Sequence, residues 1–211
     1  MLSTRRSLPL PVLGALLLLV GVGTANAQQT RAVSQATRAA MLAAPLVTPA
    51  AGGAHTDVTI VEYFDYNCPT CRELDPELHK LLAADPKVRL VRKDWAIFGD
   101  GSVYAAYASF AAARAGRYAD AHQALITSSK DLATKAQVLA VLTAAGFAGA
   151  EIEADIARHE KEYADVLARN SREATGLGLR GTPGLVVGDR LVVGGVSYRG
   201  LERLVARARG R

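Results

Sequence analysis

Apolar residues gather in four short runs that predict β-strands. The clearest is 57–64, where β-branched and aromatic side chains follow one another almost without a break. Residues 88–95 alternate between apolar and charged positions, which is typical of a second strand. Residues 185–187 and 191–193 are separated by a glycine-containing turn at 188–190, and this arrangement predicts a β-hairpin.

Helical spacing of apolar positions occupies most of the remaining chain. A helix predicted over 68–84 follows the first strand, with Asn67 as a candidate cap and Pro76 as the site of a kink. From 102 to 176 the pattern is almost wholly helical, and a last helix is predicted over 201–209. The element order is therefore strand, helix, strand, a helical block, then a hairpin and a helix.

The N-terminal residues predict export. Arg5-Arg6 precede an apolar stretch at 10–22, and small residues at 25–27 suit cleavage by a signal peptidase. Because the stretch is short for a bilayer span, we expect a signal peptide over 1–27, cleaved after Ala27, rather than an uncleaved anchor. The expected location is the periplasm. Residues 28–54 are then an N-terminal helix and linker, since their alanine-rich start gives way to proline and glycine.

Composition and charge exclude several classes of function. The formal net charge of +5 is too mild to indicate nucleic-acid binding, so no nucleic acid is expected as a partner. The 211 residues are enough to bury a core without a disulfide staple. The chain has only two cysteines. Its four histidines are scattered, and we interpret each of these histidines as a structural or surface residue. No metal site is predicted from this pattern.

The two cysteines form the motif Cys68-Pro69-Thr70-Cys71, directly after the first predicted strand. Residues i and i+3 of a helix lie one turn apart, about 5–5.5 Å between Cα atoms, which is within disulfide reach. The helix N-terminus favours an anion, so a thiolate at Cys68 would form near neutral pH. Pro69 suits the first helical position. This spacing predicts a thiol–disulfide exchange site.

The segment from Glu62 to Cys71 resembles the active-site region of the DsbA-like thioredoxin-fold family. Residues 181–183, Gly-Thr-Pro, resemble the cis-proline loop of that fold, and the helical block resembles its insertion. The resemblance covers nearly all of 55–211 and implies an α/β thioredoxin fold with an inserted helical domain. The expected segments are the two parts of the thioredoxin fold at 55–101 and 177–211, with the helical insertion at 102–176 between them.

The resemblance also implies the roles of the motif residues. Cys68 would be the exposed nucleophile and Cys71 the buried resolving thiol. Pro69 and Thr70 would tune the redox potential. Thr182, which precedes Pro183, resembles the residue at this place in some copper-tolerance members of the family, of the ScsC type.

Three further positions receive roles from the resemblance. Thr182 and Pro183 would pack against the disulfide, with a cis bond at Pro183 that presents the Thr182 backbone to a substrate strand. Glu62 would lie beneath the active site and help to manage the proton of the buried thiol. Lys93 is a candidate partner for Glu62. Trp95 is expected in the core or along a substrate groove.

The expected function is an exported thiol–disulfide oxidoreductase that forms disulfides in protein clients and needs no cofactor. Its partners would be cysteine-containing exported proteins and a membrane redox partner that recycles the dithiol. Thr70 and Thr182 replace the histidine and valine of the best-known periplasmic oxidase, so an isomerase or reductase stays open. In that case residues 28–50 could form a homo-oligomerisation helix. A Cu(I)-binding pair and a structural Cys68–Cys71 bridge are further alternatives.

Overall fold

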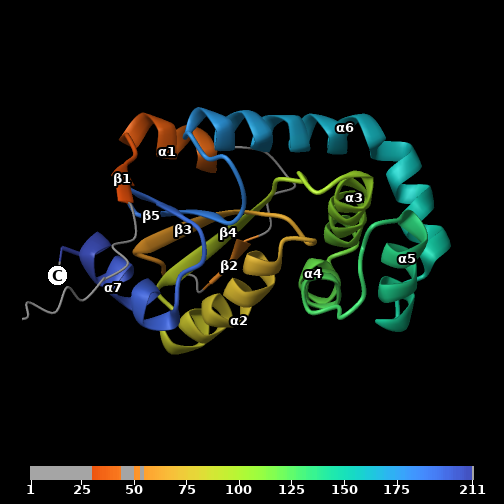
Figure 1. The fold of residues 1–211 in the computed structure, drawn as a ribbon, viewed down its shortest axis with the longest axis horizontal. Helices are drawn as coiled ribbons and strands as arrows, with labels where there is room; N and C mark the ends of the chain where they lie inside the picture. The colour runs from red at the N-terminus through yellow and green to blue at the C-terminus, as the bar shows by residue number, and fades with distance from the viewer. Residues whose placement is uncertain (1–29, 44–49, 53–54, 211) are drawn as a thin grey trace, which may run out of the picture.

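The computed structural model describes residues 30–43, 50–52 and 55–210; the predicted signal peptide and its cleavage site lie outside them. Within these residues the chain forms a mixed α/β structure (Figure 1). The elements are β1 (Thr30–Ala32), α1 (Gln35–Leu42), β2 (Ala50–Ala51), β3 (Val58–Phe64), α2 (Pro69–Ala84), β4 (Val88–Asp94), α3 (Asp100–Arg114), α4 (Tyr118–Ile126), α5 (Lys135–Ala144), α6 (Gly149–Gly176), β5 (Gly184–Val187), β6 (Arg190–Val193) and α7 (Tyr198–Ala208).

A single six-stranded sheet has the order β1-β6-β5-β3-β4-β2. The pair β3 and β4 is parallel because α2 crosses between them, whereas the other pairs are antiparallel. The register pairs Glu62 with Arg92 and Tyr63 with Lys93. Neighbours in register lie on the same face, so Glu62 and Arg92 share one face of the sheet while Tyr63 and Lys93 share the other.

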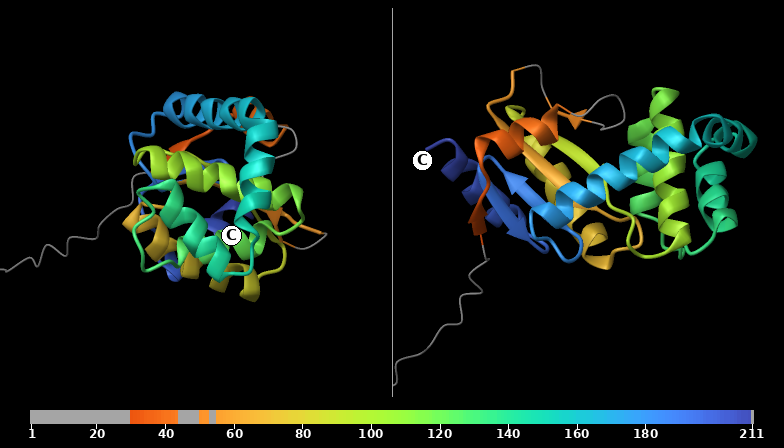
Figure 2. Two further views of the ribbon diagram at one scale, coloured as in Figure 1. Left: turned by 90° about the vertical axis from the view of Figure 1, so that its right-hand side faces the viewer. Right: turned by 90° about the horizontal axis from the view of Figure 1, so that it is seen from above.

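Helices cover both faces of the sheet. In Figure 1, α1 and α6 lie above the sheet and α2 and α7 lie below it, and the turned views in Figure 2 show the same layers. The lower core joins Ile60 and Leu90 to Leu78 of α2 and Leu201 of α7. The upper core joins strand residues to helices α1 and α6, through side chains that include Met41, Val61, Val91, Trp95, Ala174 and Val186.

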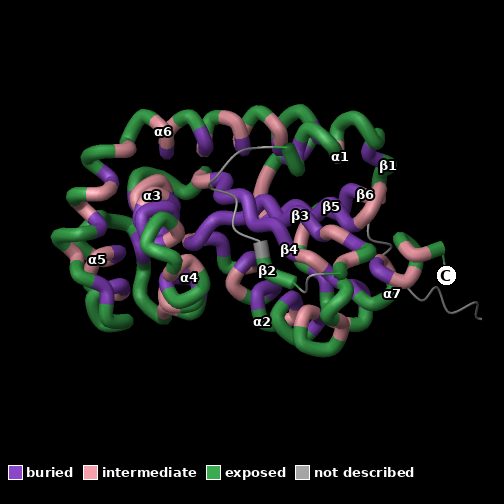
Figure 3. The backbone as a smooth tube through the Cα atoms, turned by 180° about the vertical axis from the view of Figure 1, so that it is seen from behind, coloured by how far each residue is buried: buried purple, intermediate pink, exposed green. Residues whose placement is uncertain are grey.

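The helices α3, α4 and α5 and the first part of α6 form a block at one end of the sheet, on the right in Figure 1. Its core is rich in alanine and contains Phe110, Leu125, Leu142 and Tyr163. The same cluster includes Cys68 and Cys71, so the helical block packs directly behind the cysteine motif. Figure 3 shows the buried residues concentrated along the sheet and on the inner faces of these helices.

The structure confirms the predicted strands and helices and corrects some details. The predicted helix 68–84 begins at Pro69 with Cys68 as its N-cap, so the prediction that Asn67 is the cap was wrong. The reason is that the Cys68 sulfur takes the capping position itself, while the Asn67 side chain bonds Ser102. Two short strands, β1 and β2, were not predicted. No helix in the described part of the chain is long and apolar enough to cross a membrane.

Candidate active site

Both cysteines lie at the start of α2, where the parallel strand β3 ends. The Cys68 sulfur accepts the Cys71 backbone N–H at 3.3 Å, so the thiol acts as the helix cap. Pro69 occupies the first helical turn, where a missing N–H has no cost. The Cys68 N–H donates to the Asp65 carbonyl at 3.1 Å, which closes the preceding turn. The two cysteines are not joined by a disulfide, and both are almost completely buried. The prediction that Cys68 is exposed was wrong, because the residue packs in the core cluster of the helical block.

The surroundings shift the pKa values of the two thiols in opposite directions. A hydrogen bond from the Cys71 thiol is the largest cause that lowers the pKa of Cys68, to about 6, against the effect of burial. Thr182 and the backbone of Cys71 and Thr70 act in the same direction. Burial, followed by the hydrogen bond to Cys68 and the charge of Glu62, raises the pKa of Cys71. At neutral pH, Cys68 is therefore a thiolate and Cys71 a thiol.

The loop at Thr182-Pro183 lies against Cys68. Its peptide bond is cis, and the Cys68 sulfur lies 3.3 Å from the Thr182 carbonyl oxygen, which accepts a hydrogen bond from Cys68 when the thiol is protonated. The loop continues into the β5–β6 hairpin, where a Cβ added at Gly195 would come within 2.9 Å of Thr70 Cγ2. Thr70 therefore packs closely against the end of the hairpin. The structure thus brings the predicted pair 182–183 into contact with Cys68.

Glu62 lies beneath the site and is only 2% exposed. Burial is the main reason that its pKa rises to about 7, and Arg92 opposes this rise. The closest approach of the two is 3.4 Å, between Arg92 Nε and Glu62 Oε2. The prediction that Lys93 is the partner of Glu62 was wrong. The sheet register places Lys93 on the opposite face, where it pairs with Glu173 of α6.

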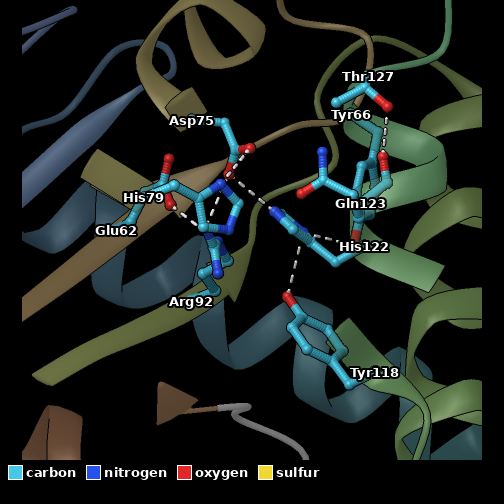
Figure 4. Close-up of polar contacts among 9 residues, drawn as sticks. All are labelled: Glu62, Tyr66, Asp75, His79, Arg92, Tyr118, His122, Gln123 and Thr127. Carbon is cyan, nitrogen blue, oxygen red and sulfur yellow. Dashed lines mark hydrogen bonds and ion pairs between the residues drawn. The ribbon is translucent and has the colours of Figure 1, made fainter. Parts of the chain in front are cut away.

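A buried polar cluster extends from Arg92 toward the helical block (Figure 4). Asp75 Oδ1 of α2 accepts a hydrogen bond from Arg92 Nη2 at 2.7 Å and lies 3.1 Å from His122 Nε2 of α4. His79, which is half-exposed, meets the other Asp75 oxygen at 3.1 Å. Sequence analysis missed Asp75 and His122 as neighbours of the site. No local pattern could reveal them, because 47 residues separate this pair along the chain.

A loop after β4 exposes two apolar side chains next to the motif. The Asp65 carboxylate accepts the backbone N–H groups of Ile97 at 2.7 Å and Phe98 at 3.1 Å. Asp65 also accepts the Asn67 N–H at 2.7 Å, so one carboxylate ties this loop to the turn before Cys68. Ile97 and Phe98 are 42% and 50% exposed. Trp95, by contrast, is buried in the upper core.

The described residues contain no group of three or more histidine, cysteine, aspartate or glutamate side chains arranged to hold a metal ion. What the geometry offers instead is one activated thiol, one buried thiol within a helical turn, and a buried carboxyl whose charge raises the pKa of the buried thiol. These are the parts required for reversible disulfide exchange.

Comparison with known proteins agrees with this geometry. The family model of the DSBA-like thioredoxin domain matches residues 59–206. A thioredoxin-like oxidoreductase from Silicibacter pomeroyi DSS-3 is 39% identical with a TM-score of 0.74, over 79% of this chain and 95% of that one. A periplasmic thioredoxin-like protein from Salmonella enterica serovar Typhimurium is 25% identical with a TM-score of 0.72, over 86% and 100%.

The catalytic domain of Proteus mirabilis ScsC shares the fold, at 24% identity and a TM-score of 0.66 over 83% of this chain and 97% of that one. No curated protein matches the chain. The family match covers more than half of the sequence, and the fold is that of a thioredoxin domain with a helical insertion. The chain therefore belongs to the DSBA-like thioredoxin-domain family and is a thiol–disulfide oxidoreductase.

Proposed function

We propose that this protein is an exported oxidase that donates the Cys68–Cys71 disulfide to cysteine-containing proteins in the periplasm. The observation that carries the proposal is the Cys68 sulfur at the N-terminus of α2, with its pKa lowered to about 6. A stabilised thiolate favours the reduced form of the pair, and this makes the disulfide a stronger oxidant. The Salmonella relative is described as periplasmic, which supports the location.

The exchange proceeds in two steps. A client thiolate attacks Cys68 Sγ, the Cys68–Cys71 bond breaks, and the Cys71 sulfur leaves with the electron pair and takes a proton from Glu62. A second client thiolate then attacks the client sulfur of the mixed disulfide and releases the Cys68 thiolate. Two electrons have passed from the client dithiol to the pair. A membrane redox partner must remove them before the next cycle.

The surroundings of Cys68 suit an extended protein client. The Thr182 carbonyl oxygen lies 3.3 Å from the Cys68 sulfur, so the backbone of the loop at 182–183 is within reach of a segment bonded to Cys68. Ile97 and Phe98 offer an apolar contact on the β4 side of the motif. Main-chain pairing combined with an apolar contact can recognise many unrelated sequences. A general oxidase requires such broad recognition of its clients.

The second candidate is an isomerase or reductase, which Thr70 and Thr182 favour. An isomerase of this type would use residues 28–50 to form an oligomer. The packing of α1 argues against this version, because Met41 is buried in the upper core of the same chain. Of the two large apolar side chains of α1, Met41 packs in its own domain and Leu42 is 41% exposed, so α1 leaves one large apolar side chain for a second copy.

The test is the redox state of the pair in the native exported protein, measured by acid quench and thiol-specific mass tagging. An oxidase should be found mostly as the disulfide. A mostly reduced pair would reject disulfide donation and favour the reductase or isomerase. As a control, Cys71→Ser should accumulate mixed disulfides with clients through Cys68, whereas the double variant that also carries Cys68→Ser should accumulate none.

A further inference from the structure

Asp75 is the centre of the buried polar cluster behind the cysteines. It lies on α2, one residue before Pro76, and is 3% exposed. Its Oδ1 atom accepts from Arg92 Nη2 at 2.7 Å and from His122 Nε2 at 3.1 Å, while Oδ2 faces His79 Nδ1 at 3.1 Å. Figure 4 shows the three partners converging on this carboxylate from a strand, the helical block and α2 itself.

Arg92 is shared unequally between two acids. Its contact with Asp75 is a hydrogen bond of 2.7 Å, whereas its Nε lies 3.4 Å from Glu62 Oε2. Neither Arg92 Nε nor Glu62 Oε2 has a hydrogen-bond partner in the described structure. Arg92 therefore interacts with both acids, through a hydrogen bond to Asp75 and through its charge with Glu62, and the negative charge of Asp75 raises the pKa of Glu62. Burial is the main reason that Glu62 can bind a proton near neutral pH, and Asp75 adds to the effect through its own charge and through its hold on Arg92.

His122 fixes Asp75 from the helical block. Its Nδ1 lies 3.2 Å from the Tyr66 hydroxyl and 3.5 Å from the Tyr118 hydroxyl, both of which have a proton to donate. Burial lowers the pKa of His122 to about 4, so the ring is neutral at physiological pH. The partners then assign the single ring proton to Nε2, where it is donated to Asp75. Every polar atom of this ring is satisfied.

We propose that Asp75 is a positioning residue for disulfide exchange, which draws Arg92 away from Glu62, and that His122 holds Asp75 in place to do so. The inference rests on the proposed function, in which Cys71 exchanges its proton with Glu62. When Cys71 attacks the mixed disulfide, its proton passes to the Glu62 carboxylate, the Cys71–Cys68 bond forms and the departing thiolate takes the electron pair. A helix of the insertion thereby controls the basicity of a group beneath the thioredoxin active site.

The charged and titratable groups that face this cluster come from five parts of the fold. Arg92 and Asp75 act directly on the charge of Glu62, and Asp94 is a buried acid whose pKa is raised by burial and by Asp65. The groups that face the cluster are Glu62 of β3, Tyr66 of the turn, Asp75 and His79 of α2, Arg92 and Asp94 of β4, and Tyr118 and His122 of α4.

The test uses the reduced protein and the chromogenic disulfide 5,5′-dithiobis(2-nitrobenzoate) in a stopped-flow instrument across pH 5 to 9. The Cys68 thiolate releases the first thionitrobenzoate, and the attack of Cys71 on the mixed disulfide releases the second. The first phase reports Cys68 and the second reports the Cys71–Glu62 proton transfer. We expect the wild-type second phase to change with an inflection near pH 7, the pKa of Glu62.

Asp75→Asn should move that inflection down by about one pH unit, because the Asp75 charge that raises the Glu62 pKa is removed and Arg92 is then compensated only by Glu62. His122→Ala should move it in the same direction by less, and His122→Gln, which keeps a donor toward Asp75, should restore it. Tyr118→Phe is the matched control, since it leaves the contact between His122 and Asp75 intact and should change nothing. If Asp75→Asn does not fold, the two His122 variants carry the same test.

The outcomes separate this inference from the proposed function. A first phase with no inflection near pH 6 in the wild type would reject the activated Cys68. The role of Asp75 would be overturned by a normal first phase together with a second-phase inflection that stays at the same pH in Asp75→Asn and His122→Ala. An effect of His122→Ala that persists in the Asp75→Asn background would show that His122 does not act through Asp75, and would overturn that part of the proposal.

Discussion

Replacing Cys71 with alanine should raise the pKa of Cys68. The Cys71 thiol is the largest of the contributions that hold this pKa at about 6. A hydrogen bond to a charged group is worth about 1.5–3 kcal/mol, and each pH unit corresponds to about 1.4 kcal/mol. The pKa of Cys68 in Cys71→Ala should therefore lie at about 7–8, still below the free-thiol value of about 8.5 because Thr182 and the backbone remain in place.

The same shift changes how stability depends on pH. A thiol whose pKa is lowered in the native state stabilises the reduced protein only where it is ionised. The stabilisation is complete above about pH 8.5, the pKa of the unfolded chain, and it is lost as the pH falls through 6. At pH 7 it amounts to about 1.4 kcal/mol in the reduced wild type and to less than about 0.5 kcal/mol in Cys71→Ala.

The assay is the thiolate absorbance at 240 nm during a pH titration, followed by urea unfolding of both reduced proteins at pH 5 and pH 7. Cys71→Ser retains an O–H donor and should titrate close to the wild type. Cys68→Ala should show no thiolate below pH 9, because burial raises the pKa of Cys71. A pKa near 6 in Cys71→Ala would refute the reasoning and assign the effect to the helix N-terminus alone.

Three further predictions concern stability, measured by urea unfolding of the reduced protein. Glu62→Gln should gain about 3 kcal/mol relative to the wild type between pH 4 and pH 7, since the unfolded carboxyl ionises above about pH 4.5 while the native one stays protonated up to about pH 7; an equal pH dependence of the unfolding free energy in the two proteins would contradict the raised pKa. Glu173→Ala should cost about 3–5 kcal/mol because it leaves the fully buried Lys93 unpaired, whereas Glu162→Ala, which breaks an exposed pair with Arg114, should cost about 1 kcal/mol or less. Gly101→Ala should destabilise strongly, because its Cβ would lie 1.9 Å from the Leu132 carbonyl oxygen, while Gly149→Ala, whose nearest neighbours are at 3.7 Å, should be neutral or stabilising; similar effects of the two would argue against the close packing at Gly101.

The parts of the fold that could be predicted are those in which local sequence decides structure. The strand β3 is an apolar and β-branched run interrupted only by Glu62, and the hairpin of β5 and β6 has Gly188 at φ 57° in its two-residue turn. The spacing of Cys68 and Cys71 is enough to predict a thiol–disulfide exchange site at the start of a helix. Thr134 forms the capping box of α5 with Gln137. In each case the residues that determine the conformation are within four positions of one another.

The parts that could not be predicted depend on partners far along the chain. Strand β1 is three residues long and exists because its backbone pairs with β6, more than 150 residues later. The choice between Arg92 and Lys93 as partner of Glu62 required the register of β3 and β4, since adjacent strand residues point to opposite faces. A one-residue difference in register exchanges the two cations.

The helical block holds the cysteine motif through two independent contacts. Asn67, one residue before Cys68, bonds both the Leu132 backbone and Ser102 of α3, while His122 of α4 bonds Asp75, four residues after Cys71. The motif is thus fixed on both sides by the block and from a third side by the loop at 182–183. A buried polar network of this kind has few alternative arrangements, because each unpaired group would be costly. The position of the motif is therefore determined jointly by the thioredoxin and helical parts.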